Sequence, residues 1–211
     1  MKSMKLAVAL ICALAMIFAM TGCNNDAAGN AEANAFEAEH AIITDGTGMW
    51  NPITEVGVDV GGEEPARVDG ISNISDGSAL TWKITSDKAG TATLTLRAAS
   101  HLRDWGTEIG GSIGVDDVSK ALALTVNGNA VAISGSLLGG AVLPENASGG
   151  TAYIVADITV TVELVEGENV IVFTSLGDST QYNLFMDKLI VDTNANLTFT
   201  KTDNSGRVWG G

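Results

Sequence analysis

Residues 157–164 read DITVTVEL, and polar and apolar side chains alternate along the whole stretch. Successive side chains of a β-strand point to opposite faces, so this alternation predicts a strand with one apolar face and one polar face. Residues 91–96 (TATLTL) repeat the pattern, and residues 121–126 and 170–174 are further runs of apolar and β-branched residues. Strands with one wet face are typical of antiparallel sheets.

Turn signals separate these runs, at residues 88–90, 127–129 and 166–169, and each contains glycine. No segment keeps the 3.6-residue period of an amphipathic helix. The sequence therefore predicts an all-β chain that forms one β-sandwich of about eight to ten strands.

The composition argues against nucleic-acid binding and for a folded domain. The chain has 211 residues, and its 11 Lys and Arg against 25 Asp and Glu give a formal net charge of -14. Binding to nucleic-acid phosphates requires clustered Lys and Arg, so a nucleic-acid partner is not expected. An apolar fraction of 45% and a charged fraction of 17% predict a folded core.

The first 22 residues have the pattern of a bacterial export signal: a basic head, 15 apolar residues from Leu6 to Met20, and small residues before a cysteine. The sequence Met20-Thr21-Gly22-Cys23 resembles the lipobox of bacterial lipoproteins. That resemblance implies cleavage before Cys23, a lipid on Cys23, and a chain anchored to the cell membrane and facing outside the cytoplasm. The alternative is an ordinary secretory signal.

The rest of the chain, after the expected signal peptide, divides into three segments. Residues 23–35 contain almost no bulky apolar side chain and are expected to be a flexible tether. Residues 36–193 hold the predicted strands and form the expected single domain. Residues 194–211 have little apolar content, and we expect this tail to be disordered.

Acidic residues near both ends of the domain suggest a cation site. A single strand over residues 36–43 would place Glu37 and Glu39 on one face, about 7 Å apart. In the strand at 185–191, Asp187 would share a face with the apolar residues Phe185, Leu189 and Val191 and need a partner. If the two strands pair, the three carboxylates converge, and Ca²⁺ prefers such oxygen ligands. Alternatively, Glu37 and Glu39 are solvated edge residues and Asp187 pairs with an Arg or a backbone N–H.

Five stretches, in this order and spacing, resemble carbohydrate-binding modules of families 6 and 35, and the similarity covers about residues 36–193. They are FEAE at 36–39, LTWKITSDKAGTATLTLRAAS at 80–100, LALTVNG at 122–128, GGTAYIVADITVTVELVEGENVIVFTS at 149–175 and YNLFMDKLIV at 182–191.

The resemblance implies a β-sandwich jelly roll with a structural Ca²⁺ held by Glu37, Glu39 and Asp187. It also implies a sugar site in the loops at one edge of the sandwich. There Asn183 would match the family's asparagine before the last strand, and Tyr153 its loop aromatic. An aromatic ring can pack on the apolar face of a pyranose while an amide bonds its hydroxyls.

Other aromatic residues are candidates for the same site. Trp50 lies in the first loop, where the family often has a second ring. Trp105 lies in a long insertion at 101–120 and could bind sugar or anchor the loop. Tyr182 could line the site or cap the strand, whereas Trp82 lies within a strand and is expected in the core.

The function expected from these observations is non-catalytic binding of a polysaccharide or glycan by a membrane-anchored, Ca²⁺-stabilised module. The alternative is a structural or protein-interaction lipoprotein that keeps the jelly roll without a sugar site. A glycosidase needs two carboxylates flanking the scissile bond, and Asp104, Glu108, Asp116 and Asp117 could supply them. A small sandwich with one acidic loop is more typical of a binding module, so we do not expect an enzyme.

Overall fold

The computed structural model of the chain describes residues 34–47, 51–100, 114–137, 151–177 and 183–207. Contacts divide the chain into Met1–Ala33 and Asn34–Gly211, and every described residue belongs to the second unit. The expected signal peptide at 1–22, Cys23 and tether residues 24–33 lie outside the described residues. Within those residues, no helix is long and apolar enough to cross a membrane.

Sheet A contains seven strands. They are β1 (Ala35–Glu37), β3 (Ile53–Asp59), β4 (Ala66–Ile74), β6 (Gly90–Ser100), β9 (Thr151–Tyr153), β10 (Ala156–Leu164) and β12 (Leu184–Asp192). Their order is β10-β6-β12-β4-β3-β9, and β1 also pairs with β12. All of these pairs are antiparallel except β3 with β9.

Sheet B contains six strands. They are β2 (Ile42–Thr44), β5 (Ala79–Ser86), β7 (Leu122–Val126), β8 (Asn129–Val131), β11 (Gly167–Ser175) and β13 (Leu197–Phe199). Their order is β13-β5-β11-β7-β8, and β2 also pairs with β5. Two 3₁₀ turns complete the secondary structure of the described residues, η1 (Ala38–His40) and η2 (Val118–Lys120).

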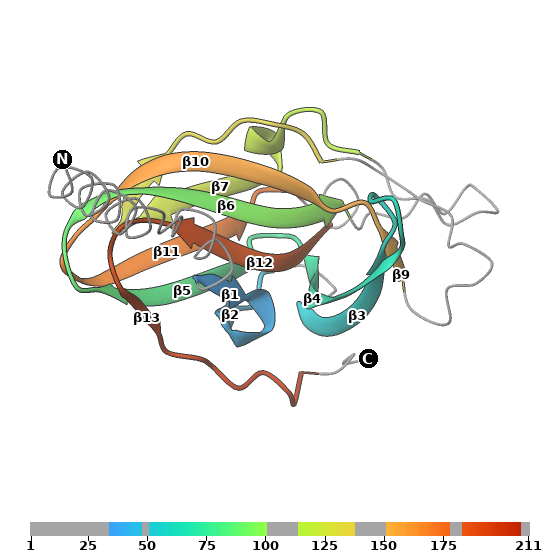
Figure 1. The fold of residues 1–211 in the computed structure, drawn as a ribbon. Helices are drawn as coiled ribbons and strands as arrows, with labels where there is room; N and C mark the ends of the chain where they lie inside the picture. Colours follow the sequence, from blue (N-terminus) through green and yellow to red (C-terminus); the bar gives the residue numbers. More distant parts are fainter. Residues whose placement is uncertain (1–33, 48–50, 101–113, 138–150, 178–182, 208–211) are drawn as a thin grey trace, which may run out of the picture. The chain divides into compact units, whose positions relative to one another are not determined.

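The expected all-β sandwich is confirmed, and Figure 1 shows β10, β6 and β12 in one layer with β7, β11 and β5 in the other. Successive strands from β4 to β7, and again from β10 to β13, alternate between the two sheets. This alternation is the connectivity of a jelly roll. The described residues contain more strands than the eight to ten expected, because several are only three residues long.

The alternating stretch that predicted the fold lies in β10. Its residues Ile158, Val162 and Leu164 are buried, and the Thr and Glu residues between them face outward. The turn that the sequence predicted at residues 127–129 is also present, and it connects β7 to β8. Asn127 and Gly128 have φ of 52° and 79°, as a two-residue hairpin with an Asn-Gly turn requires.

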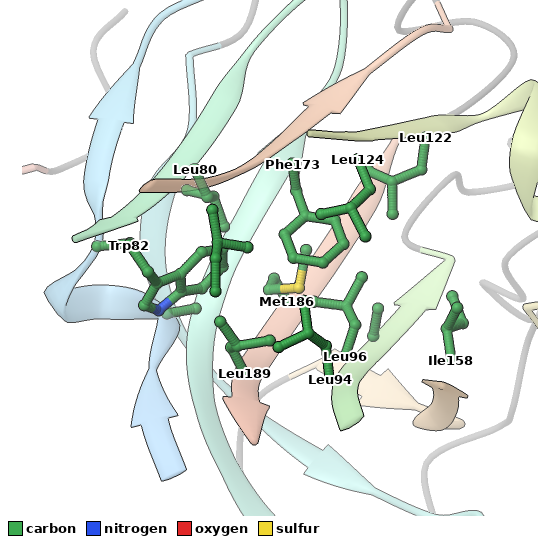
Figure 2. Packing of buried hydrophobic residues seen from close by; sticks show 14 of the residues in the cluster. Leu80, Trp82, Leu94, Leu96, Leu122, Leu124, Ile158, Phe173, Met186 and Leu189 are labelled. Atoms are coloured by element: carbon green, nitrogen blue, oxygen red, sulfur yellow. The ribbon is translucent and has the colours of Figure 1, made fainter. Parts of the chain in front are cut away.

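The core fills the space between the two sheets. Trp82 is fully buried, as expected, and its Nε1–H donates a hydrogen bond of 3.2 Å to the carbonyl oxygen of Phe36. Its ring meets that of Phe173 edge-on, with centroids 5.7 Å apart. Figure 2 shows these two rings packed with Leu80, Met186 and neighbouring leucines.

The N-terminal segment is not one strand, so the expectation for residues 36–43 is wrong. β1 pairs with β12 in sheet A, the 3₁₀ turn η1 follows, and β2 pairs with β5 in sheet B. The chain therefore crosses from one sheet to the other within these residues. The crossing removes Glu39 from the strand and places it on the turn.

The C-terminal tail is also different from what we expected. β13 pairs with β5, and the chain then continues beneath β1 and β2 (Figure 1). Asn204 is 8% exposed and makes hydrogen bonds to η1. Disorder is therefore the wrong description for residues 194–207. Their low apolar content did not predict order because backbone pairing and a buried amide hold the segment.

Two strand glycines provide a test of the packing. A Cβ on Gly70 would lie against the backbone oxygen of Met186 and 2.7 Å from Cζ of Phe185, whereas a Cβ on Gly90 would have no heavy atom within 4 Å. We expect Gly70→Ala to lower the free energy of unfolding by about 1–3 kcal/mol or more. Gly90→Ala should leave it unchanged or raise it by up to about 1 kcal/mol. Denaturant titration of both variants measures the difference, and equal stabilities would contradict this packing.

Candidate functional site

Strand β12 is irregular at Asp187. On one edge, Met186 pairs with Ala98 and Lys188 pairs with Arg97 of β6, so Asp187 is an extra residue that forms a β-bulge. On the other edge, β12 pairs with β4 up to Met186 and with β1 from Lys188 onward. Asp187 therefore lies where β12 exchanges one neighbouring strand for another.

The bulge also changes which side chains share a face. Met186 and Leu189 both belong to the core between the sheets, whereas Phe185 belongs to a separate small cluster. The expectation that Asp187 shares a face with Leu189 is therefore wrong. The extra residue interrupts the two-residue period, and Asp187 lines a cavity outside the main core.

We call this opening the Asp187 cavity, and its volume is about 440 Å³. Eight of its lining residues are charged, and they come from β1, η1, β3, β4, β6 and β12. The lining residues are Glu37, Glu39, Asp59, Ala66, Arg67, Val68, Asp69, Arg97, Asp187 and Lys188. Carboxylate acceptors and cationic donors thus lie side by side on its walls.

Loose ion pairs connect the charges. Arg97 Nε lies 3.7 Å from Asp187 Oδ2 and 3.2 Å from Asp157 Oδ1. Lys188 Nζ lies 3.4 Å from Glu37 Oε1 and 4.0 Å from Asp187 Oδ1. With these separations, the carboxylate of Asp187 makes no hydrogen bond to any other described residue, although only 7% of the residue is exposed. The alternative in which Asp187 pairs with an arginine is therefore present in the structure.

Burial dominates the electrostatics of this carboxyl. Loss of hydration raises the pKa of Asp187 to about 6, and the nearby carboxylates of Glu37 and Glu39 add to the rise. Lys188 and Arg97 oppose the rise in pKa but do not cancel it. The existing ion pairs therefore leave the negative charge on Asp187 incompletely compensated.

Glu39 is in a similar situation. Burial raises its pKa, and the carboxylate of Glu37 contributes to the rise. Its Oε2 atom is buried and has no hydrogen-bond partner in the described part of the chain. A buried acceptor without a partner is costly and indicates a place where a cation or donor would be stabilising.

Glu37, Glu39 and Asp187, the three carboxylates that the sequence analysis proposed as metal ligands, all line one cavity, and their role as ligands stays a prediction. Their oxygen donors and the unpartnered Oε2 atom fit a hard cation such as Ca²⁺. Their spacing does not yet form a coordination shell: among the described residues, no group of three or more His, Cys, Asp or Glu could hold a metal as it stands. Cation binding would therefore draw these carboxylates together, in competition with the Lys188 ammonium.

Tyr153, predicted to stack on a sugar, is buried. It is 1% exposed, and its ring stacks on Phe185 with centroids 3.9 Å apart. Its hydroxyl donates a 2.7 Å hydrogen bond to Glu55 Oε2. In this position the ring presents no free face to a ligand, and its contacts connect β9 with Phe185 of β12 and Glu55 of β3.

Asn183 is also buried, at 8% exposure. Its Nδ2 donates a 3.2 Å hydrogen bond to Asn73 Oδ1, while its own Oδ1 has no partner among the described residues. The remaining predicted sugar-binding residues, Trp50, Trp105 and Tyr182, lie outside the described residues. Their role at a sugar site stays a prediction.

A second cavity, of about 360 Å³, was not predicted from the sequence. It lies between η1, β3, β4 and the C-terminal segment, and it shares Glu39 and Asp69 with the Asp187 cavity. Its other lining residues are His40, Thr54, Glu55, Val56, Gly70, Asp203, Asn204 and Ser205. No sequence signal could have found it, because its walls come from segments that are distant in the chain.

No protein-family model and no curated protein matches the chain. Among solved structures, it is similar to a family 35 carbohydrate-binding module from Cellvibrio japonicus, with 18% identity over 78% of this chain and 95% of that chain and a TM-score of 0.44. It is also similar to a family 35 module from Clostridium thermocellum, with 24% identity over 75% of this chain and 96% of that chain and a TM-score of 0.44.

An exo-β-1,3-galactanase from Phanerochaete chrysosporium, crystallised with β-1,3-galactotriose, is similar over part of its length. The identity is 20% over 75% of this chain and 29% of that chain, with a TM-score of 0.43. The two modules belong to one of the families that the sequence motifs resemble.

The raised pKa of Asp187 predicts a pH dependence of stability in the absence of metal. Between about pH 4 and pH 6 the folded state keeps the Asp187 proton while the unfolded chain has released it, so stability falls as pH rises. We expect the stability of Asp187→Asn relative to wild type to increase across this window, by up to about 3 kcal/mol, and to be constant above about pH 7. Denaturant titrations in chelator at several pH values measure this difference. A difference independent of pH would refute the raised pKa.

Proposed function

We propose that this chain is a non-catalytic glycan-binding module built on a β-sandwich. The observation that carries the proposal is the Asp187 cavity, whose size lies within the range of ligand pockets. Sugar hydroxyls both donate and accept hydrogen bonds, and the cavity offers cationic donors beside carboxylate acceptors. These groups stand mainly on strands of one sheet, so little order has to be gained on binding.

Arg67 and Asp69 form the part of the cavity that is open to solvent. Arg67 donates to both carboxylate oxygens of Asp69, from Nε at 3.2 Å to each and from Nη2 at 2.9 Å to Oδ1. The two side chains are 71% and 48% exposed, so a ligand can reach them. A planar guanidinium beside a carboxylate is suited to bond the neighbouring hydroxyls of one sugar ring.

Ca²⁺ is the second part of the proposal, with Glu37, Glu39 and Asp187 as ligands. The donor chemistry, the raised pKa of Asp187 and the unpartnered Glu39 Oε2 all support it. The bound ion would supply the positive charge that Lys188 and Arg97 provide only in part. It would thereby stabilise the junction of β12 with β1, next to the glycan-binding wall.

Membrane anchoring through a lipid on Cys23 is the third part, and it rests on the lipobox-like sequence. A lipid would hold many copies of the module at one surface. A polysaccharide with repeated epitopes would then bind several copies at once, and effective concentration would raise the avidity above that of one weak site.

One observation favours the alternative, a structural or protein-interaction lipoprotein that keeps the fold without a sugar site. Tyr153 and Asn183 are both buried, and a sugar site built on these residues would need them at the surface. A protein partner would then contact the acidic surface of the module. The two functions differ in whether any glycan binds.

The cation part predicts a response to Ca²⁺. Ligand binding to the folded state alone stabilises it, so Ca²⁺ should raise the melting temperature and excess chelator should reverse the rise. Asp187→Asn should abolish the response because it removes a ligand charge. Asp192→Asn, on the exposed end of the same strand, should keep it. Thermal melts with and without Ca²⁺ check this, and an unchanged response in Asp187→Asn would contradict the site.

The glycan part predicts binding on an array of polysaccharides and oligosaccharides. Arg67→Ala should weaken binding to the best glycan about tenfold, because one charge-assisted hydrogen bond is worth about 1.5–3 kcal/mol. Its melting temperature should change little, since Arg67 is exposed. Lys83→Ala removes an exposed cation from sheet B and should not change binding. An array without any bound glycan would instead support the protein-interaction function.

A further inference from the structure

The segment after β13 crosses from sheet B to sheet A. We call residues 200–207 the C-terminal strap. It begins where β13 leaves β5, and at its far end the carbonyl oxygen of Arg207 accepts a 3.2 Å hydrogen bond from Thr54 Oγ1 on β3. The Arg207 guanidinium also bonds Asp45 and the carbonyl oxygen of Pro52. The strap is therefore fastened at both ends and lies beyond the 36–193 region of family resemblance.

Between these anchors, the strap donates hydrogen bonds to three successive carbonyl groups. Two of them belong to η1 and the third to the residue after it. Asn204 Nδ2 donates to the carbonyl oxygen of Glu39 at 2.9 Å and to that of Ala41 at 2.7 Å. The Thr202 N–H donates to the carbonyl oxygen of His40 at 2.9 Å. Carbonyl groups at the end of a helical turn have no partner within the turn, and here the strap supplies all three.

The side chain of Glu39 depends on this turn for its position. It lines both cavities, near Glu37 on one side and next to the strap on the other. Its Oε2 atom is buried without a hydrogen bond to the described residues, and the carboxylate accepts a hydrogen bond only from its own backbone. Repulsion from Glu37 and the loss of hydration both favour its escape to solvent. The fixed backbone of η1 opposes this escape.

We infer that Asn204 is a positioning residue for the proposed cation site: its two hydrogen bonds hold η1 so that the Glu39 carboxylate stays in the Asp187 cavity. This inference rests on the cation part of the proposed function. It assigns a role to a residue that lies outside the sandwich strands and whose side chain bonds backbone carbonyl groups, not the three carboxylates. Outer residues that orient metal ligands typically contribute 10–100-fold to metal affinity.

The test is the Ca²⁺ affinity of the full chain, measured by isothermal titration calorimetry. Asn204→Ala should weaken Ca²⁺ binding 10–100-fold. Asn196→Ala is the matched control, because Asn196 lies in the same tail but bonds Asp87, away from η1. Its Ca²⁺ affinity should equal that of wild type. If Asn204→Ala does not fold, Thr54→Val removes the bond that fastens the strap to β3 and should weaken binding in the same direction.

A double-mutant cycle with Glu39→Gln separates positioning from general stabilisation. If Asn204 acts through Glu39, Asn204→Ala should change the affinity much less in the Glu39→Gln background. A merely structural role would lower the melting temperature in chelator and leave the Ca²⁺ affinity unchanged. That result, with normal Ca²⁺ binding by wild type, would overturn the inference about Asn204 but not the proposed cation site. Absence of Ca²⁺ binding by wild type would overturn the proposed cation site and the inference with it.

Discussion

Desolvation of one carboxylate, that of Asp187, is the constraint on which this end of the sandwich depends. The bulge places Asp187 where β12 leaves β4 and takes up β1, so its side chain is buried at a seam in the sheet. Burial of a charge is unfavourable unless opposite charge is close. Arg97 and Lys188 approach only to 3.7 and 4.0 Å, and the pKa of Asp187 consequently remains raised.

The same seam explains why the charged residues gather there. At Asp187 the edge of β12 passes from β4 to β1, and residues of all three strands line the Asp187 cavity. Charged side chains from six elements therefore line the same cavity, although each element contributes only one or two of them. In the proposed function, a cation compensates the buried carboxylates while the exposed Arg67 and Asp69 face a glycan, so one cavity serves stability at its inner wall and recognition at its outer one.

The C-terminal strap connects residues outside the sandwich strands to the turn η1, which forms part of a cavity wall. A 3₁₀ turn of three residues has little stability of its own, because most of its carbonyl groups lack partners. Asn204 and the backbone of Thr202 complete the turn from the far end of the chain. The tail lines the smaller cavity directly, and the turn that it completes carries Glu39, which lines both cavities.

The sequence alone determined the all-β class, the strands β6, β7, β10 and β11, and the burial of Trp82, because alternation and Asn-Gly turns act between near neighbours. It also suggested that Glu37, Glu39 and Asp187 approach one another if the first and last strands pair, and β1 does pair with β12. Only the tertiary structure decided that residues 36–43 cross between sheets, that a bulge changes the face of Asp187, and that Tyr153 is buried. Those features depend on pairing with strands remote in the chain, and a local two-residue period carries no information about where such pairing stops.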